Sequence, residues 1–489
     1  MNKNQKTRRS RGFAWMIGSG LLLSAAALLT TSCADTFDSK ETFDVGVRNA
    51  TLESPNEADV KITPSTDGST MSIEWPVVYG AGGYEFKLLN SSDETKPIVA
   101  DTIDGCKRTV PREEDMNYKI VIRTLGNAKL NNTEASKATE KAYSTFTESD
   151  GKIPAGTDLF KFFTENNPIG SDVAISKELN FDLEPGAKYT LSKPLNFNYH
   201  KIVLRTSDKA NRATITLADS ANFIISNDFT LKYINLDASA CVLPTLEAYK
   251  YSEEPPTDII PKPKNYLMID FVRLIGCDIK GVIGSLFFDN NKSWAVVNFL
   301  IKNSIIEMNT DTKSIKNESF ISFQGGGIKN FQIESSTVHQ IGNGNSKYFI
   351  RYNNSVRVDR MGYETSDHTT LTYTNNTFYR VASGQWANYS GISNYSAYNI
   401  QNNIWVDCAD GNIARRIMGN GRLGNNCTAI WSNNTYWKDG AAVDQGTYDT
   451  GTILTTDPAF TDPANKNFRP TGAQQVEKKT GDQRWYEAN

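Results

Sequence analysis

The sequence is poor in the residue types that build metal and redox centres. Only three histidines occur in 489 residues, and none lies at metal-ligand spacing from another. The six cysteines are scattered and include no Cys-x-x-Cys pair, the spacing typical of zinc and redox motifs. The sequence therefore predicts no metal site and no cofactor. The cysteines after Cys33 are expected to be buried free thiols, although a bridge between Cys408 and Cys427 stays open.

The sequence also lacks an excess of positive charge and long apolar runs. Lys and Arg number 52 against 55 Asp and Glu, and the net charge of −3 argues against nucleic acid as a partner. The apolar stretch 13–29 is broken by Gly18 and Gly20, and it falls short of the roughly 20 apolar residues that a spanning helix needs. No later segment is apolar enough to cross a bilayer.

What the N-terminus does contain is a secretory signal. Five basic residues precede the apolar stretch, and small residues precede Cys33, which is the order expected of a cleaved signal peptide. Ser32-Cys33 resembles the loose lipobox of Bacteroidetes lipoproteins, and the acidic residues behind it resemble their signal for the outer face of the outer membrane. The resemblance implies that residues 1–32 are removed, that Cys33 carries the only membrane anchor, and that residues 33–46 form a tether. Cleavage would change the net charge from −3 to −8.

Residues 47–147 show short alternating segments separated by turn residues, a pattern typical of an antiparallel β-sandwich. Three such segments are 71–75, 83–89 and 118–124. Trp75, the following Gly-Tyr-x-Phe segment and a late strand beginning at Tyr118 resemble a fibronectin type III domain. The resemblance implies a tryptophan between two sheets and a corner tyrosine bonded to the main chain. Nothing in this region indicates catalysis, so we expect it to be a spacer.

The next segment, residues 148–157, has the composition of a linker. Residues 158–166 then predict a short helix, with Thr157 or Asp158 as N-cap and an apolar side formed by leucine and phenylalanine. Such a helix would suit the end of a β-solenoid, whose first coil must be covered.

From residue 158 to 489 the chain predicts a solenoid. A pair of small or polar residues followed by x-apolar recurs at separations of 27, 32, 40, 27 and 31 positions, close to one coil with loops. Stacked Asn and Ser side chains would bond from coil to coil, and the apolar positions would fill one continuous core. The predicted core positions are Ile279, Ile306, Val338, Phe378, Trp405 and Tyr436, of which Tyr436 needs a partner for its hydroxyl.

This region resembles the pectin-lyase-like right-handed parallel β-helix, and more narrowly Bacteroidetes lipoproteins with uncharacterised β-helix modules behind a fibronectin-like domain. Residues 183–192 resemble the opening coil, and residues 457–468 with 481–485 resemble the closing segment. The predicted fold class is thus all-β: an N-terminal fibronectin type III-like β-sandwich followed by a right-handed parallel β-helix. The family resemblance implies a role in polysaccharide use at the cell surface, but it supplies no catalytic residues.

Two enzyme templates on this fold can be compared with the sequence. The aspartate set of polygalacturonases is missing except for the chance match 309–311. A lyase instead needs a base and a cation that acidifies the proton α to the uronate carboxylate. Arg351, Arg357 and Arg360 are weak candidates for the base. Calcium would be required only in this alternative, and the acidic residues Asp359, Glu364 and Asp367 form no ligand motif.

Sugar binding has better candidates. A Gly/Ser/Asn-rich stretch, 383–399, contains aromatic residues whose exposed rings would stack on sugars, and nearby arginines would pair with carboxylates. We expect loops of neighbouring coils to bring both kinds of residue together, although rings that staple loops onto the solenoid are the alternative. The candidates are Trp386, Tyr389, Tyr395, Tyr398, Arg415, Arg416 and Arg422.

The sequence therefore favours a surface lipoprotein that binds or presents an acidic, pectin-like polysaccharide within a glycan-utilisation system. Other outer-membrane glycan-uptake proteins would be its partners. A polysaccharide lyase acting on a uronate-containing glycan by β-elimination is the second hypothesis, and a structural or adhesive surface protein is the third.

Overall fold

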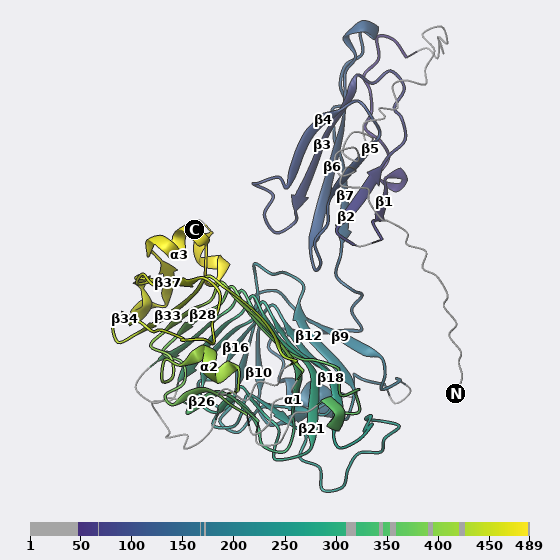
Figure 1. The fold of residues 1–489 in the computed structure, drawn as a ribbon. Coiled ribbons are helices and arrows are strands. Elements are labelled where there is room, and N and C mark those ends of the chain that lie inside the picture. The colour runs from purple at the N-terminus through teal and green to yellow at the C-terminus, as the bar shows by residue number, and fades with distance from the viewer. Residues whose placement is uncertain are drawn as a thin grey trace, which may run out of the picture. The chain divides into compact units, whose positions relative to one another are not determined.

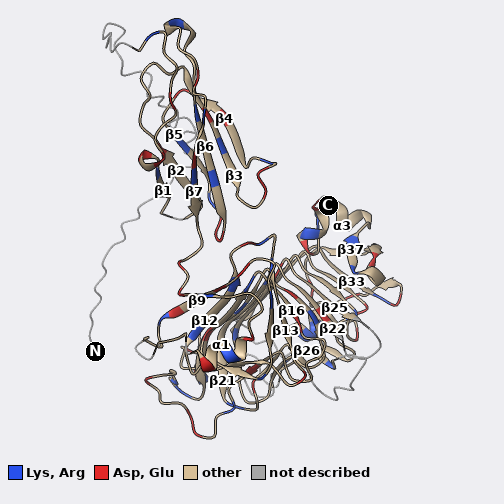
Figure 2. Cartoon of the chain, turned by 180° about the vertical axis from the view of Figure 1, so that it is seen from behind, with Lys and Arg blue, Asp and Glu red and all other residues tan. Residues whose placement is uncertain are grey.

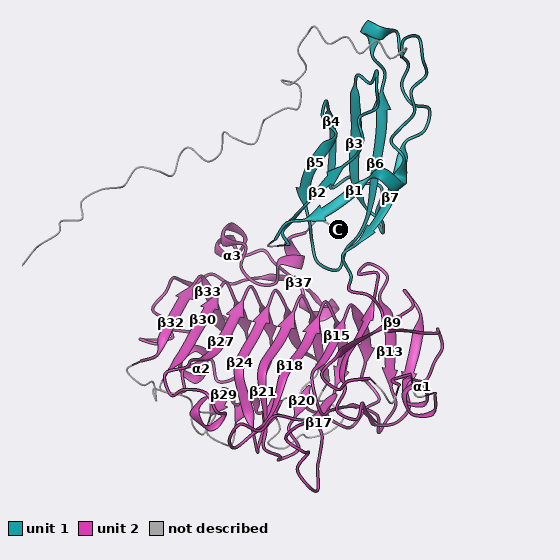
Figure 3. Ribbon diagram, turned by 90° about the vertical axis from the view of Figure 1, so that its right-hand side faces the viewer, with its two compact units in different colours: residues 1–146 teal, residues 147–489 magenta. Residues whose placement is uncertain are grey.

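The computed structural model describes residues 47–66, 68–166, 168–170, 173–309, 319–341, 346–352, 358–389, 395–419 and 426–487. The chain divides into two compact units, Met1–Phe146 (unit 1) and Thr147–Asn489 (unit 2) (Figure 3). Both consist almost entirely of strands (Figure 1). Within the described ranges, no helix is long and apolar enough to cross a membrane.

Unit 1 consists of two antiparallel sheets over one core. One sheet has the order β1-β2-β5 and the other β4-β3-β6-β7, and buried side chains of both form a single apolar cluster. Trp75 stacks on Phe86 in this core, with 5.9 Å between ring centroids, and the hydroxyl of Tyr118 accepts a hydrogen bond from the Glu113 amide at 2.7 Å. These are the two contacts expected of Trp75 and Tyr118 above. The elements are η2 (Glu57–Asp59), β1 (Lys61–Pro64), β2 (Thr70–Glu74), β3 (Gly83–Asn90), β4 (Val99–Ile103), β5 (Lys107–Pro111), β6 (Asn117–Leu125), η3 (Ala128–Leu130) and β7 (Thr139–Ser144).

Unit 2 is built from three sheets that the chain visits in turn, and their strands are parallel except for the antiparallel pair of β33 and β34. The ten-stranded sheet contains, in spatial order, β8 (Gly151–Ile153), β9 (Glu178–Leu183), β12 (Lys201–Thr206), β15 (Phe229–Lys232), β18 (Leu267–Ile275), β21 (Trp294–Lys302), β24 (Gly327–Glu334), β27 (Thr369–Thr374), β30 (Ser396–Gln401) and β32 (Thr428–Ser432). The eleven-stranded sheet contains β10 (Lys188–Leu191), β13 (Ala213–Leu217), β16 (Ile234–Asp237), β19 (Asp278–Val282), β22 (Ile305–Asn309), β25 (Thr337–Ile341), β28 (Thr377–Tyr379), β31 (Ile404–Val406), β33 (Asn434–Lys438), β34 (Ala441–Ala442) and β35 (Ile453–Leu454).

The third, seven-stranded sheet contains β11 (Leu195–Asn196), β14 (Phe223–Ile225), β17 (Leu246–Ala248), β20 (Phe287–Phe288), β23 (Ser319–Phe323), β26 (Tyr348–Tyr352) and β29 (Gln385–Tyr389). From β9 to β29 each coil contributes one strand to each sheet, so unit 2 is a parallel β-helix. Its winding is right-handed, the sense that nearly all parallel crossover connections adopt.

The predicted core column is confirmed. Ile279, Ile306, Val338, Phe378, Trp405 and Tyr436 are each paired with the next in register, and each is at most 1% exposed. Trp405 and Tyr436 stack with ring centroids 5.1 Å apart. The hydroxyl of Tyr436 donates to buried Asp449 at 2.8 Å, which is the partner that this residue needed.

The polar pair before each core residue makes the turn between the ten-stranded and eleven-stranded sheets. Its first residue has a positive φ, for example 56° at Asn375 and 57° at Asn402, and asparagine tolerates this region better than most residues. The second residue points inward: Asn376, Asn403 and Asn434 are fully buried. The Asn376 side chain donates to Asn403 at 2.9 Å, and that of Asn403 to Asn434 at 3.1 Å. The predicted ladder of hydrogen bonds therefore runs along the solenoid.

The first coil is covered by the expected helix. Helix α1 (Leu159–Glu165) is capped by the Asp158 side chain, which accepts from the Phe160 amide. Phe163 makes edge contacts with Phe181 and Phe197 of the first coil, at 4.9 and 5.0 Å. The prediction of a linker at 148–157 is wrong in part, because β8 lies within it and pairs with β9. Exposed hydrogen-bonding groups at the edge of β9 explain why this polar segment becomes a strand.

The C-terminal segment, residues 455–487, folds back onto the eleven-stranded sheet (Figure 1). It comprises β36 (Phe460–Asp462), η5 (Pro463–Asn465), β37 (Asn467–Pro470), α3 (Ala473–Lys478) and η6 (Gln483–Tyr486). The Thr337 hydroxyl donates to Asp482 at 2.8 Å and accepts from the Trp485 indole at 2.9 Å. The segment that resembles a closing motif in sequence thus covers this sheet.

Candidate functional site

The aromatic residues proposed for sugar stacking lie mostly in the interior, so the expectation that they form exposed platforms is wrong. Trp386 is 0% exposed and stacks on Phe349, with 4.3 Å between centroids. Tyr389 and Tyr398 are also buried, and burial raises the pKa of both hydroxyls. The physical reason is that 383–399 is not one loop: it contains β29 and the start of β30, and the rings of Trp386, Tyr389 and Tyr398 pack into the core from these strands.

Tyr395 differs from the other three rings, because it is half-buried at the start of β30. Its carbonyl accepts from the Thr369 amide at 3.2 Å, and its ring meets the exposed His368 edge-on, with 6.4 Å between centroids. These contacts place Tyr395 at an edge of the ten-stranded sheet, beside β27 rather than beside the candidate arginines.

Arg415 and Arg416 lie on a short helix. Helix α2 (Ile413–Ile417) follows β31, at the position where the next strand of the seven-stranded sheet would begin, and it packs against β29. Arg415 is exposed, whereas Arg416 is half-buried and forms an ion pair with Asp410 at 3.0 Å. Arg422 lies outside the described residues.

The weak candidates for a lyase base are separated in the structure. Arg351 is half-buried on β26, and Arg360 is exposed at the end of η4 (Val358–Arg360), while Arg357 lies outside the described residues. The Glu364 amide donates to the Asp367 carboxylate at 3.2 Å within a turn. In the described part of the chain, no three His, Cys, Asp or Glu side chains are grouped so as to hold a metal ion.

A surface with polar side chains lies along the last strands of the seven-stranded sheet. Arg351 is in register with Ser322 on one side and Asn388 on the other. Both neighbours of Asn388, Ala387 and Tyr389, belong to the buried core, so Asn388 faces outward. Helix α2, which contains the exposed Arg415, packs against β29. We name Arg351, Asn388 and Arg415 the arginine strip.

The guanidinium group of Arg351 also lies 5.8 Å from the centroid of the Tyr348 ring, in cation–π geometry. Tyr348 is 7% exposed, so its ring supports the arginine from the side without offering a free face to a ligand. Sequence reasoning missed Asn388 in the strip. The signal was its place between two inward residues in Gln385–Tyr389, which becomes readable once β29 is known to be a strand.

The other two long faces have different properties. On the eleven-stranded sheet, the C-terminal segment covers His339, which is 2% exposed and lies 4.9 Å from the Phe468 ring. Burial, with a smaller effect of Lys466, lowers the pKa of His339 to about 4. On the ten-stranded sheet, outward residues of neighbouring strands include Asn298 and Asn330, bonded to each other at 3.0 Å.

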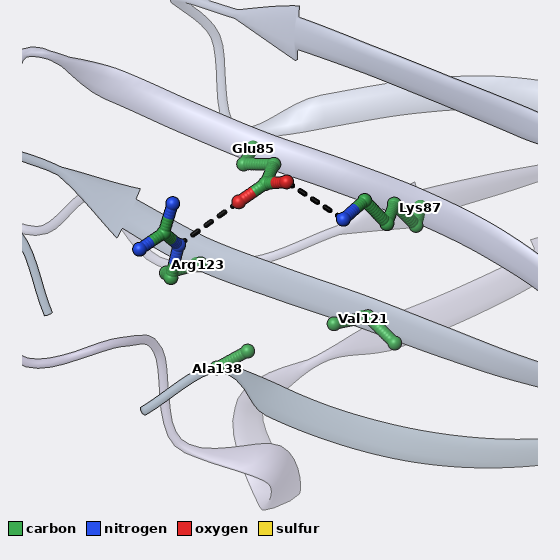
Figure 4. Close-up of a pocket in the computed structure, with 5 residues that line it drawn as sticks. All are labelled: Glu85, Lys87, Val121, Arg123 and Ala138. Atoms are coloured by element: carbon green, nitrogen blue, oxygen red, sulfur yellow. Dashed lines mark hydrogen bonds and ion pairs between the residues drawn. The ribbon is translucent and has the colours of Figure 1, made fainter. Parts of the chain in front are cut away.

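Unit 1 contains an open cavity of about 340 Å³ on the face of its four-stranded sheet. Glu85 lies between Lys87, at 2.8 Å, and Arg123, at 2.9 Å (Figure 4). Both cations lower the pKa of Glu85, Lys87 more than Arg123. The charges neutralise one another, and Figure 2 shows both basic and acidic residues on the ribbon of unit 1.

The cysteines that the structure describes are all free thiols: Cys106, Cys241, Cys277, Cys408 and Cys427. The bridge between Cys408 and Cys427 is therefore not formed, and burial raises the pKa of the Cys408 thiol to about 12. Cys33, the predicted lipidation site, lies outside the described residues.

Two family models match the chain. One, described as a domain of unknown function, matches residues 8–186, and the other, described as a domain of unknown function (DUF4957), matches residues 187–341. No curated protein matches.

Solved structures that resemble the chain include two pectate lyases. Pectate lyase PelI from Erwinia chrysanthemi, in complex with tetragalacturonic acid, is 12% identical with a TM-score of 0.19, over 68% of this chain and 84% of that one. Pectate lyase Pel3 from Pectobacterium carotovorum is 9% identical with a TM-score of 0.17, over 81% and 99%. The assignment of the parallel β-helix rests on the strand pairing described above.

Proposed function

We propose that this protein is a lipid-anchored outer-membrane protein that binds an acidic, uronate-containing polysaccharide through the arginine strip. The single observation that carries the proposal is the order of groups on neighbouring elements: Arg351 on β26, Asn388 beside it on β29, and exposed Arg415 on α2. Guanidinium groups pair with carboxylates in bidentate geometry, and an amide between them bonds sugar hydroxyls.

The spacing between neighbouring strands along the solenoid axis favours the binding of an extended polysaccharide chain. Neighbouring strands lie about 4.8 Å apart, so the strip offers polar groups in succession along the axis rather than at one point. The chain is mildly acidic overall, with a net charge of −3. An acidic glycan would therefore have to bind at a local group of cations, since the global field does not attract it.

The remaining parts of the proposal come from the sequence. Lipidation of Cys33 would supply the membrane anchor, and unit 1, which we propose to be fibronectin type III-like, would act as the spacer. Other outer-membrane proteins of a glycan-uptake system would be the partners at the cell surface.

A binding measurement tests the proposal directly. Retention on a gel containing polygalacturonate is compared for the parent chain, Arg351→Ala with Arg415→Ala, and Arg469→Ala, an exposed arginine on β37 that serves as the matched control. A charge-assisted hydrogen bond contributes about 1.5–3 kcal/mol. Loss of two such hydrogen bonds should weaken binding of the glycan at least about tenfold, at 1.4 kcal/mol per decade of affinity. Added salt should weaken binding further, because it screens the charges.

The outcomes separate the three hypotheses. Equal retention of the double variant and the control would exclude the arginine strip as the site. Appearance of an unsaturated, ultraviolet-absorbing product from polygalacturonate, lost in Arg351→Ala, would favour the lyase. Absence of retention on every acidic and neutral glycan tested would favour a structural or adhesive protein.

A further inference from the structure

The described part of unit 1 begins at Val47, and the end of the unit around this residue has a distinct surface. Val47 contacts Gly80: a side chain at position 80 would approach the Val47 Cγ1 atom to 2.8 Å. The amide of buried Asn132 donates to the carbonyls of Val47, at 2.8 Å, and Gly80, at 3.0 Å. The start of unit 1 is therefore fastened to the loop between β2 and β3.

That loop presents two large apolar side chains to solvent. Tyr79 is 68% exposed and Val77 is 61% exposed, which makes them the two most exposed large hydrophobic residues in the described chain. The loop is fixed, because the Val78 amide donates to the hydroxyl of core residue Tyr84 at 2.7 Å. A single exposed apolar residue needs no explanation, but two on one anchored loop form a small apolar tip.

The surroundings of this tip suit a membrane surface. Segments 47–50, 76–82 and 126–132 meet here, and their only charged residues are the exposed cations Arg48 and Lys129. The neighbouring turn between β4 and β5 adds one acid, Asp104. Tyrosine is enriched where protein meets the headgroup layer, and cations near an anionic surface add attraction.

The chain enters and leaves unit 1 at opposite ends. It enters beside Gly80 and Gly126, near the C-terminal end of β6. It leaves after Ser144, which pairs with Asn117 at the other end of the same strand. Strand β6 has nine residues, a length of about 30 Å at roughly 3.4 Å per residue. The apolar tip is thus on the side of unit 1 from which the N-terminal tether arrives.

We infer that the apolar tip, defined as Val77, Tyr79, Arg48 and Lys129, docks onto the surface of the membrane to which the protein is anchored. The inference rests on the proposed lipidation of Cys33. About a dozen residues separate Cys33 from Val47, and even fully extended they span only about 50 Å. The tether is attached at this end of unit 1 and keeps it within that distance of the bilayer, and the tip gives unit 1 a second, non-covalent contact with it.

A fluorescence experiment tests the contact on the full lipidated chain. A polarity-sensitive fluorophore is attached to Val77→Cys, or to Ile98→Cys as the matched control. Ile98 is 41% exposed, and its amide bonds to Leu88 near the opposite end of unit 1. The protein is then bound to vesicles of phosphatidylethanolamine and phosphatidylglycerol, with the parent chain labelled in parallel to measure the background from its own thiols.

The expected result is a blue shift at position 77 and quenching there by spin-labelled lipid, with neither at position 98. The shift should decrease when Tyr79→Ser is added to Val77→Cys. If the protein floats with the vesicles but the fluorophore at position 77 keeps the emission that it has in water, the docking inference is wrong and the lipid anchor stands. If the protein does not float, the lipid anchor fails and the inference falls with it. A shift at position 77 that is the same without vesicles would mean that protein covers the tip, which also overturns the inference.

Discussion

Replacement of Asn403 by alanine removes one rung of the asparagine ladder. The side chain is fully buried, and its Nδ2 donates to the Tyr373 carbonyl at 2.8 Å and to the Gln401 carbonyl at 3.0 Å. Its Oδ1 accepts from the Asn376 main-chain amide at 3.1 Å and from the Asn376 side chain at 2.9 Å. One side chain therefore forms hydrogen bonds both within its own coil and to the preceding coil.

The magnitude follows from the groups left behind. In Asn403→Ala the Asn376 amide and the Tyr373 carbonyl lose a buried partner. Each such group costs about 1–3 kcal/mol, so the free energy of unfolding should fall by about 4 kcal/mol. The matched control is Asn399→Ala, a half-buried outward position on the same strand β30, where a change within about 0.5 kcal/mol is expected.

The assay is guanidinium unfolding followed by circular dichroism, with hydrogen exchange of the Asn376 amide as a local probe. Exchange is needed because a solenoid can lose neighbouring coils without unfolding as a whole. If Asn403→Ala loses less than about 1 kcal/mol and the Asn376 amide stays protected, the ladder does not hold the coils together and the reasoning is wrong.

Three further predictions concern buried polar groups. Tyr436→Phe leaves the Asp449 carboxylate without its hydroxyl donor and should lower the free energy of unfolding by about 1–3 kcal/mol, measured by denaturant unfolding. Arg205→Ala removes a 1%-exposed guanidinium that pairs with Asp182 at 2.6 Å; a loss of about 3–5 kcal/mol is expected in the same assay, and a loss below that of a surface variant would contradict it. Because the pKa of His339 is lowered from 6.5 to about 4 by burial, the unfolded chain binds a proton that the folded chain does not. The free energy of unfolding should therefore fall as pH drops from about 6.5 to about 4, by up to about 3 kcal/mol, and His339→Gln should abolish that part of the pH dependence.

The repeat was predictable because one corner of the coil is short and nearly invariant. Asn402 and Asn403 turn the chain in two residues, and Trp405 then points inward, so the sequence spacing alone locates the core column. The other two corners contain loops of variable length, such as the 18 residues between β17 and β18. Their strands therefore cannot be placed by counting along the repeat.

The candidate site was predicted less well for the same reason. Residues 383–399 have a loop-like composition, yet Gln385–Tyr389 forms a strand in which Trp386, Ala387 and Tyr389 are buried. From the composition we predict that Trp386 lies at the surface, whereas in the structure its ring is buried and stacks on Phe349 of the neighbouring strand. Arg415 was identified by its charge, but Asn388 required the strand register, which a single sequence does not contain.

The C-terminal segment has a consequence for the order in which the molecule can be completed during synthesis. Coils can stack one after another as the chain emerges from its N-terminus, since each needs only its predecessor. The bond between Thr337 and Asp482, however, joins residues 145 positions apart. The part of the eleven-stranded sheet around Thr337 and His339 must therefore stay uncovered until residues 455–487 have been made, and a chain that stops before this segment would leave that part exposed.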